Sequence, residues 1–238
     1  MTLLTLIFTL SGLFTDIFNN LRDLILLSLF FIVIFALPAY YGLIKSNGLK
    51  KGLIGILALS FFALIFESIA IKTGVPYGYF NYTNLIGPKL FNTVPISIAF
   101  AWPPLVIGAF TILSKHRKNF LLTILFTSLL LVLIDMVIDP GAVSLNFWEW
   151  QNKEFLYHVP ISNYIGWFIS GIFGSSILFV VYKKLKDINN NFKFLLMSLY
   201  LIITYWTFVD LFKGLFISSI IGIALMLYIF KELTFDEY

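Results

Sequence analysis

Apolar runs long enough to cross a bilayer limit how this chain can fold more than any other feature of its sequence. Residues 192–230 are almost unbroken apolar sequence, and because one membrane helix needs about 20 residues, this run must hold two helices, divided near residues 210–214. The whole chain is 60% hydrophobic and 12% charged, with a mean hydropathy of +0.95. This composition predicts an all-α polytopic membrane protein, since a lipid-exposed backbone must satisfy its own hydrogen bonds.

The remaining apolar runs extend this pattern over a single integral membrane domain, residues 1–238. The first run, residues 2–18, lacks a basic region and a small-residue cleavage site, so we interpret it as a short membrane helix rather than a signal peptide. The count is eight helices if this run spans and seven if it lies only in the interface. Trp102-Pro103-Pro104 should kink one helix in its middle. The expected helices are residues 2–18, 24–44, 52–71, 90–113, 120–138 and 161–182 and the two halves of 192–230.

The basic residues predict the orientation in the cell membrane. Eleven of them fall on one face of the expected topology and five on the other, and the richer face belongs in the cytoplasm. Both termini should then be cytoplasmic, and the loops 73–88 and 139–160 should share the outer face. This distribution explains the net charge of +4 without nucleic acid. The cytoplasmic group is Lys45, Lys50, Lys51, Lys115, Arg117, Lys118, Lys183, Lys184, Lys186, Lys193 and Lys231, and the outer group is Arg22, Lys72, Lys89, Lys153 and Lys213.

Several kinds of site are absent from the sequence. It has no cysteine, and its two histidines, His116 and His158, are far apart, which does not suit a haem or zinc site. We find no glycine-rich phosphate loop and no nucleophile elbow. The sequence therefore predicts neither a metal nor a cofactor, and it carries no signal for an oligomeric state.

Two aspartates in one predicted membrane helix are the first candidates for chemistry. Asp135 and Asp139 are four residues apart, so on a helix their Cβ atoms lie about 5–6 Å from each other. Each charge costs about 2.5–3.5 kcal/mol at the centre of a bilayer, which favours a functional role. Two anions this close cannot both stay ionised, so an acid should sit beside a carboxylate. Alternatively, Asp139 merely ends the helix before Pro140, where Asp139-Pro140-Gly141 should break into a loop, and Asp135 bonds a neighbouring helix.

A third carboxyl lies at the same end of its own predicted helix. Glu67 is near the outer end of residues 52–71, so it could meet the two aspartates near the outer boundary. In the alternative, Glu67 pairs with Lys72 or with a helix terminus. Asp210 lies where the last apolar run should turn, and we expect it to be solvated.

Aromatic residues near these acids could line a cavity. Tyr79 belongs to the dense cluster at residues 77–82, and Trp148 and Trp150 belong to the loop after Asp139. Aromatic faces stabilise cations, which favours a lining role. An interfacial aromatic belt is the alternative. Trp102, Asn163 and Trp167 could line the same cavity, although packing would explain each of them equally well.

The order and spacing of these motifs resemble a known family. Glu67 is followed by G-V-P-Y-G-Y-F-N-Y, G-P at 87–88, V-P at 94–95 and Trp102, and then by Asp135, D-P at 139–140, W-E-W, V-P at 159–160 and N-Y-I-G-W. This succession, over about residues 60–185, resembles the carotenoid biosynthesis family of membrane proteins, which includes bisanhydrobacterioruberin hydratase and bacterial carotenoid 1,2-hydratases.

The resemblance implies a polytopic, cofactor-free enzyme that acts on a lipophilic carotenoid within the lipid bilayer. Such an enzyme adds water across a terminal double bond of an acyclic carotenoid. A protonated carboxyl would protonate the alkene, a tertiary cation would form against aromatic faces, and a carboxylate would deprotonate the water that adds. We expect Asp135, Asp139 and Glu67 to transfer protons, and the cavity to be shaped by Trp102, Tyr79, Trp148, Trp150, Asn163 and Trp167.

Two other functions fit parts of the pattern. D-M-V-I-D at 135–139 could be the D-x-x-x-D of an intramembrane prenyltransferase that binds magnesium on a diphosphate, although such enzymes use a second acidic cluster. Alternatively, Glu67, Asp135 and Asp210 could form the proton relay of a transporter, although the sequence has no obvious inverted repeat.

Overall fold

The computed structural model describes residues 21–116, 119–152, 155–182 and 188–234. Seven helices in these ranges are long and apolar enough to cross a membrane, which confirms the prediction of an all-α polytopic membrane protein. The predicted helix at residues 2–18 lies outside the described residues, as do Arg117, Lys118, Lys153, Lys183, Lys184 and Lys186.

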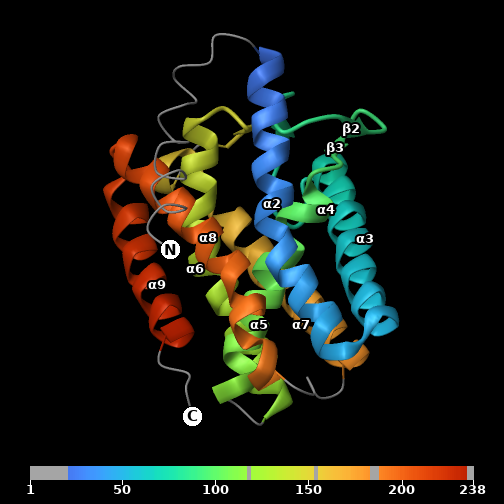
Figure 1. Cartoon of the computed structure of the whole chain (residues 1–238). Coiled ribbons are helices and arrows are strands. Elements are labelled where there is room, and N and C mark those ends of the chain that lie inside the picture. The colour runs from blue at the N-terminus through green and yellow to red at the C-terminus, as the bar shows by residue number, and fades with distance from the viewer. Residues whose placement is uncertain (1–20, 117–118, 153–154, 183–187, 235–238) are drawn as a thin grey trace.

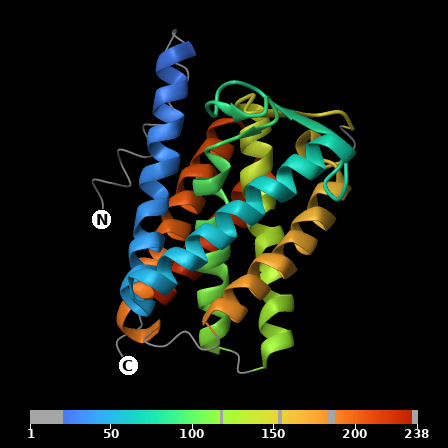
Figure 2. The ribbon, with the colours of Figure 1, turned by 90° about the vertical axis from the view of Figure 1, so that its right-hand side faces the viewer.

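Successive membrane helices run antiparallel in one bundle (Figures 1 and 2). α9 packs against α8 and α6, and α2 packs along α8. The predicted division of the last apolar run is confirmed, since a turn at 213–215 separates α8 from α9. The membrane helices are α2 (Leu21–Asn47), α3 (Leu49–Thr73), α5 (Pro103–His116) with the short α4 (Ile98–Ala101) before it, α6 (Phe120–Ser144), α7 (Ile161–Tyr182), α8 (Ile188–Phe212) and α9 (Phe216–Thr234).

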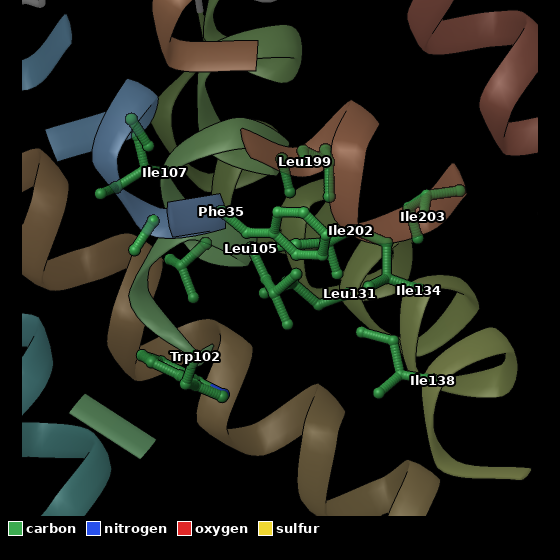
Figure 3. Close-up of a cluster of buried hydrophobic side chains, with 14 of the residues drawn as sticks. Phe35, Trp102, Leu105, Ile107, Leu131, Ile134, Ile138, Leu199, Ile202 and Ile203 are labelled. Carbon is green, nitrogen blue, oxygen red and sulfur yellow. The ribbon is translucent and has the colours of Figure 1, made fainter. Parts of the chain in front are cut away.

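Aliphatic side chains fill the middle of the bundle between α5, α6 and α8. Leu131, Ile134, Leu199 and Ile203 are fully buried and meet in this layer, as Figure 3 shows. Small residues let the helices approach each other closely, as is common between membrane helices. A Cβ atom added to Gly171 of α7 would lie 3.0 Å from the Cα of Ser128 in α6.

The predicted helix at 90–113 begins later than expected. Residues 89–95 form a hairpin instead, in which β2 (Lys89–Leu90) pairs with β3 (Val94–Pro95). Asn92 sits in the turn with a φ of 55°, a conformation that asparagine tolerates well. Pro95 disfavours a helical conformation of the residue before it, so the helical path starts only at Ile98 and bends at Trp102 into α5.

α6 does not break at Asp139-Pro140-Gly141, so this prediction is wrong. The helix continues to Ser144 with Pro140 inside it. A proline removes only its own N–H from the helix ladder, and here the carbonyl that loses its donor is that of Met136. The helix ends where Leu145 donates its N–H to the carbonyl of Gly141 and Asn146 takes a φ of 57°. Both Asp135 and Asp139 therefore lie in helix, and the following loop starts at residue 145.

The two long loops meet at one end of the bundle, as the sequence predicted. β1 (Phe80–Tyr82) pairs antiparallel with β4 (Trp148–Trp150), with Asn81 opposite Glu149. The Thr83 hydroxyl donates to the carbonyl of Asn146 at 2.8 Å. We call this the loop end of the bundle; it also carries the 3₁₀ turn η1 (Leu156–His158) and the α8–α9 turn. The cap that the paired loops form covers the ends of α3, α6 and α7 (Figure 2).

Candidate active site

A cavity of about 140 Å³ lies beneath the paired loops. Its wall includes Glu67 from α3, Asp135 and Asp139 from α6 and Asn163 from α7. The fold therefore brings together the three carboxyls that the sequence analysis selected. The rest of the wall is mostly apolar and comes from α2, α4, α5, α8 and the two loops.

Asn163 bridges the two aspartates. Its Nδ2 atom donates to Oδ2 of Asp135 at 2.6 Å and to Oδ2 of Asp139 at 2.5 Å. The bridge is enclosed by protein, because each aspartate is 1% exposed and Asn163 is 1% exposed. Asp139 is thus no solvated helix end, which rules out the simpler interpretation of this residue.

Two tryptophans of β4 add further donors to Asp139. The indole N–H groups of Trp148 and Trp150 donate to its Oδ1 atom at 2.5 Å and 3.1 Å. Alternate residues of a strand point to the same side, so both indoles reach α6 while Glu149 between them is exposed. With Asn163, Asp139 accepts three N–H donors, whereas Asp135 accepts one. Hydrogen bonds from N–H groups favour the ionised form of a carboxyl, so Asp139 is the better carboxylate of the pair.

Glu67 is held by the other loop strand. The Tyr82 hydroxyl donates to Oε2 of Glu67 at 3.2 Å, so Tyr82 of β1, and not Lys72, is its hydrogen-bonding partner. Burial raises the pKa of Tyr82 well above its usual value, and the phenol therefore stays protonated as a donor. Glu67 also lies within electrostatic range of Asp139. The paired strands β1 and β4 thus supply donors to Glu67 and Asp139, whereas Asp135 is bonded by Asn163 of α7.

Aromatic rings form a nearly continuous wall around the acids. Phe80 packs against Trp150 with ring centroids 4.7 Å apart, and Tyr82 packs against Trp148 at 5.6 Å. On the α3 side, Phe62 packs against Trp102 at 5.4 Å. The cavity lining includes Trp102, Trp148, Trp150, Asn163 and Trp167, as predicted.

Tyr79 is the one predicted lining residue that the structure places elsewhere. Its side chain is 52% exposed, and its ring lies over Gly74 outside the cavity. In β1, Phe80 and Tyr82 face inward while Asn81 faces out, and Tyr79 falls on the outward side of this alternation. The residues missed in its place are Tyr77, Phe80 and Tyr82, and a two-residue period applied to Y-G-Y-F-N-Y could have found the last two.

Other parts of the lining gave no signal in the sequence. α2 contributes Phe31, Ile32 and Phe35, and α8 contributes Ile202, Tyr205 and Trp206. These residues belong to apolar membrane helices, in which the sequence does not distinguish an apolar side chain that lines a cavity from one that faces lipid. Only the packing of α2 against α8 selects them.

Asp210 is buried, contrary to the expectation that it is solvated. It is 0% exposed, because α8 continues to Phe212 and the turn comes only afterwards. Neither of its carboxyl oxygens has a hydrogen-bonding partner among the described residues. Asp210 is not part of the cavity lining.

The donors around the aspartates suit protons better than a cation. Three of the four carboxyl oxygens of Asp135 and Asp139 accept N–H groups, and these donors compete with a metal for the same lone pairs. Within the described ranges, no three histidine, cysteine, aspartate or glutamate side chains are grouped as a metal site would require.

Comparisons with known proteins agree with this architecture. The family model described as carotenoid biosynthesis protein matches residues 24–229. The chain belongs to the carotenoid biosynthesis protein family. The matched range contains Glu67, Asp135, Asp139 and Asn163 of the cavity wall.

One relative with a named activity supports the same family. Bisanhydrobacterioruberin hydratase of Haloarcula japonica is 33% identical to the chain over 147 residues. The match covers 60% of this carotenoid biosynthesis protein and 50% of the relative, so the chain spans about half the length of the relative it matches. No solved structure matches the chain.

Proposed function

We propose that this protein adds water across a terminal C=C bond of an acyclic carotenoid by acid and base catalysis. The observation that carries the proposal is the set of three carboxyls, Glu67, Asp135 and Asp139, in one aromatic cavity at the loop end. An alkene hydration needs one group that gives a proton and one that takes a proton. The relative named as a hydratase supports the same reaction class.

The hydrogen bonds divide the two roles between the aspartates. Asp139, with three N–H donors, is the base, and Asp135, with one, is the acid. The Asp135 hydroxyl transfers its proton to the less substituted alkene carbon, and a tertiary cation forms on the other. Water adds to this cation, and Asp139 takes the proton that the water loses. Transfer of this proton back to Asp135 restores the protonation state that the enzyme had at the start. The net reaction is therefore the addition of one water to the alkene, which gives an alcohol.

Aromatic faces stabilise the cation between these two steps. A cation within about 6 Å of an aromatic ring is attracted by the negative face of the ring. Phe80, Trp148 and Trp150 surround the aspartates and supply such faces. Glu67, held by Tyr82, adds a third carboxyl that can share charge with the pair.

The cavity suits the end of a carotenoid and not the whole molecule. An apolar cavity of about 150 Å³ holds a molecule the size of benzene, and this cavity has a volume of about 140 Å³. The reacting end group therefore fits inside, while the rest of the polyene extends toward the lipid.

Expression in a host that accumulates an acyclic carotenoid tests the proposal. Mass spectrometry of the pigments should show the gain of one water at an end group when the protein is present. Isolated membranes should keep this activity in the presence of a chelator, which separates hydration from a magnesium-dependent prenyl transfer. If several acyclic carotenoids gain no water, the proposed function is wrong.

A further inference from the structure

A second group of buried polar side chains lies near the aspartates but outside the cavity. It consists of Asp210 of α8, Tyr164 of α7 and Ser218 of α9, which are 0%, 8% and 0% exposed. Both carboxyl oxygens of Asp210, the hydroxyl of Tyr164 and the hydroxyl of Ser218 have no hydrogen-bonding partner in the part of the chain that the structure describes. An unsatisfied buried polar group costs about 1–3 kcal/mol, so a cluster of them indicates a ligand that supplies the missing hydrogen bonds.

Asp210 lies against the same helix that carries the catalytic pair. A Cβ atom added to Gly141 of α6 would lie 2.8 Å from Oδ1 of Asp210, and Gly141 follows Asp139 by two residues. Ser218 of α9 lies at about the same height in the bundle as Asp210. Gly222 packs on Thr207 across the α8–α9 hairpin, so Ser218, four residues earlier, lies level with the end of α8.

Tyr164 connects this cluster to the active site. It follows Asn163 directly in α7, and its hydroxyl lies within electrostatic range of Asp135, Asp139 and Asp210. Phe155 packs against its ring with centroids 6.0 Å apart. The Tyr164 hydroxyl is therefore the member of this cluster that is also within electrostatic range of the bridged aspartates.

The cluster also lies close to the surface of the loop end. Leu211, Phe212, Lys213 and Gly214 directly after Asp210 are exposed. Tyr157 of η1 lies over the start of α9, where its hydroxyl accepts the N–H of Ile217 at 3.1 Å. About one helical turn thus separates Asp210 from the exposed α8–α9 turn at the loop end.

We propose that Asp210, Tyr164 and Ser218 bind a short chain of water molecules through which the water that is added reaches Asp139. This inference rests on the proposed function, since it supplies the second substrate of the hydration. Buried water typically makes about three hydrogen bonds to groups that are otherwise unsatisfied, and the cluster offers four such atoms. The carotenoid and the water then approach the aspartates from different sides, one through the aromatic cavity and one through the polar cluster.

The fate of the cation reports on the supply of water. When water adds, the product is an alcohol. When water is lacking, the cation instead loses a proton from a neighbouring carbon to Asp139, which gives an isomeric alkene of unchanged mass. The ratio of isomerised to hydrated carotenoid therefore measures water supply and does not depend on how much protein is folded.

Asp210→Leu and Tyr164→Phe test the route in membranes that contain an acyclic carotenoid. Each variant should raise the ratio of isomerised to hydrated carotenoid about tenfold or more, because it removes hydrogen-bonding partners of the bound water. Asp210→Asn, which keeps two hydrogen-bonding atoms, should stay within about threefold of the wild-type ratio. Chromatography with mass spectrometry separates the two products.

Thr204→Val is the matched control on the same helix. Thr204 is 3% exposed and its hydroxyl donates to the carbonyl of Tyr200 within α8, so this variant should keep the wild-type ratio. The proposed water route is overturned if Asp210→Leu and Tyr164→Phe keep the wild-type ratio of isomerised to hydrated carotenoid. This includes the case in which both products fall by the same factor. A wild-type protein that hydrates nothing overturns the proposed function itself, and the route with it.

Discussion

Asn163 is the residue that makes two neighbouring aspartates into one site. Its single amide nitrogen contacts both carboxyls at 2.6 Å and 2.5 Å, which fixes their oxygens toward each other and toward the cavity. The sequence predicts the pair and its helical spacing, but it gives Asn163 only a general place in the lining. Its bridging role depends on the rotation of α7 relative to α6, which cannot be predicted from the identity of residue 163.

The first prediction concerns the proton donor. Asp135→Asn keeps the shape of the side chain but removes the acid, so hydrated product should fall about 100-fold or more, as is typical when a general acid is lost. The variant should still insert into the membrane and keep its thermal unfolding midpoint within a few degrees. Pigment analysis by mass spectrometry and a melting curve of the purified protein measure the two effects.

Tyr79→Phe is the control for that variant. Tyr79 lies outside the cavity and is half exposed, so product formation should stay within about twofold of the wild type. Normal turnover by Asp135→Asn would show that Asp135 is not the proton donor.

At the scale of elements, the β1–β4 pairing links the two loops to the acids. Tyr82 of β1 donates to Glu67, and the alternate residues Trp148 and Trp150 of β4 donate to Asp139. The sequence predicts that both loops lie at one end of the bundle, because two membrane helices separate them. It could not predict that they pair as strands, since two three-residue strands are stabilised mainly by what they pack against.

The second prediction addresses these donors. Trp148→Phe and Trp150→Phe keep the aromatic ring and remove one N–H each, and a hydrogen bond to a charged group contributes about 1.5–3 kcal/mol. Each variant should therefore slow hydration about 10-fold to 100-fold. Because both indoles bond the same Oδ1 atom, the double variant should differ from the sum of the single effects. Strict additivity in this double-mutant cycle would show that the two donors act on separate sites.

The third prediction addresses the contact of α6 with α7. Gly171 lets the backbone of Ser128 approach closely, so Gly171→Leu should push the helices apart and lower stability by roughly 1–3 kcal/mol. Activity should fall as well, because Asn163 moves away from the aspartates. Val180→Leu, at a position of α7 that is 69% exposed, is the control. Equal melting temperatures for the two variants would argue against a tight helix contact at Gly171.

The misplaced helix boundaries have a common cause. Pro140 lies inside α6, whereas the turn before Pro95 replaces the start of an expected helix. Proline only disfavours helix locally, and in α6 the surrounding bundle overrides this preference. Apolar length predicted the membrane helices well, because it reflects the thickness of the bilayer and not the neighbours of each residue.

At the scale of the whole molecule, the site lies at one end and much of the basic charge lies at the other. Lys45, Lys115 and Lys231 occupy helix ends opposite the loop end. The positive-inside rule then predicts that the acids lie near the outer leaflet. The carotenoid would thus be hydrated on the outer side of the membrane.

The fourth prediction tests this orientation. The chain has no cysteine, so single cysteines can be introduced without background labelling. Phe91→Cys, at a hairpin position that is 94% exposed, should react with a membrane-impermeant thiol reagent in intact cells. Lys50→Cys, at an exposed position in the first turn of α3 at the opposite end of the bundle, should react only after the cells are opened. If Lys50→Cys reacts in intact cells and Phe91→Cys reacts only in opened cells, the orientation in the membrane is the reverse of the one predicted.

The central claim is that carboxyls in one membrane cavity add water to an alkene. Incubation of the purified protein with an acyclic carotenoid in water labelled with oxygen-18 tests it most directly. We predict a product that carries one labelled oxygen atom per hydrated end, formed by the wild type and not by Asp135→Asn. A product without the label, or equal labelled product from the Asp135→Asn variant, would contradict the account.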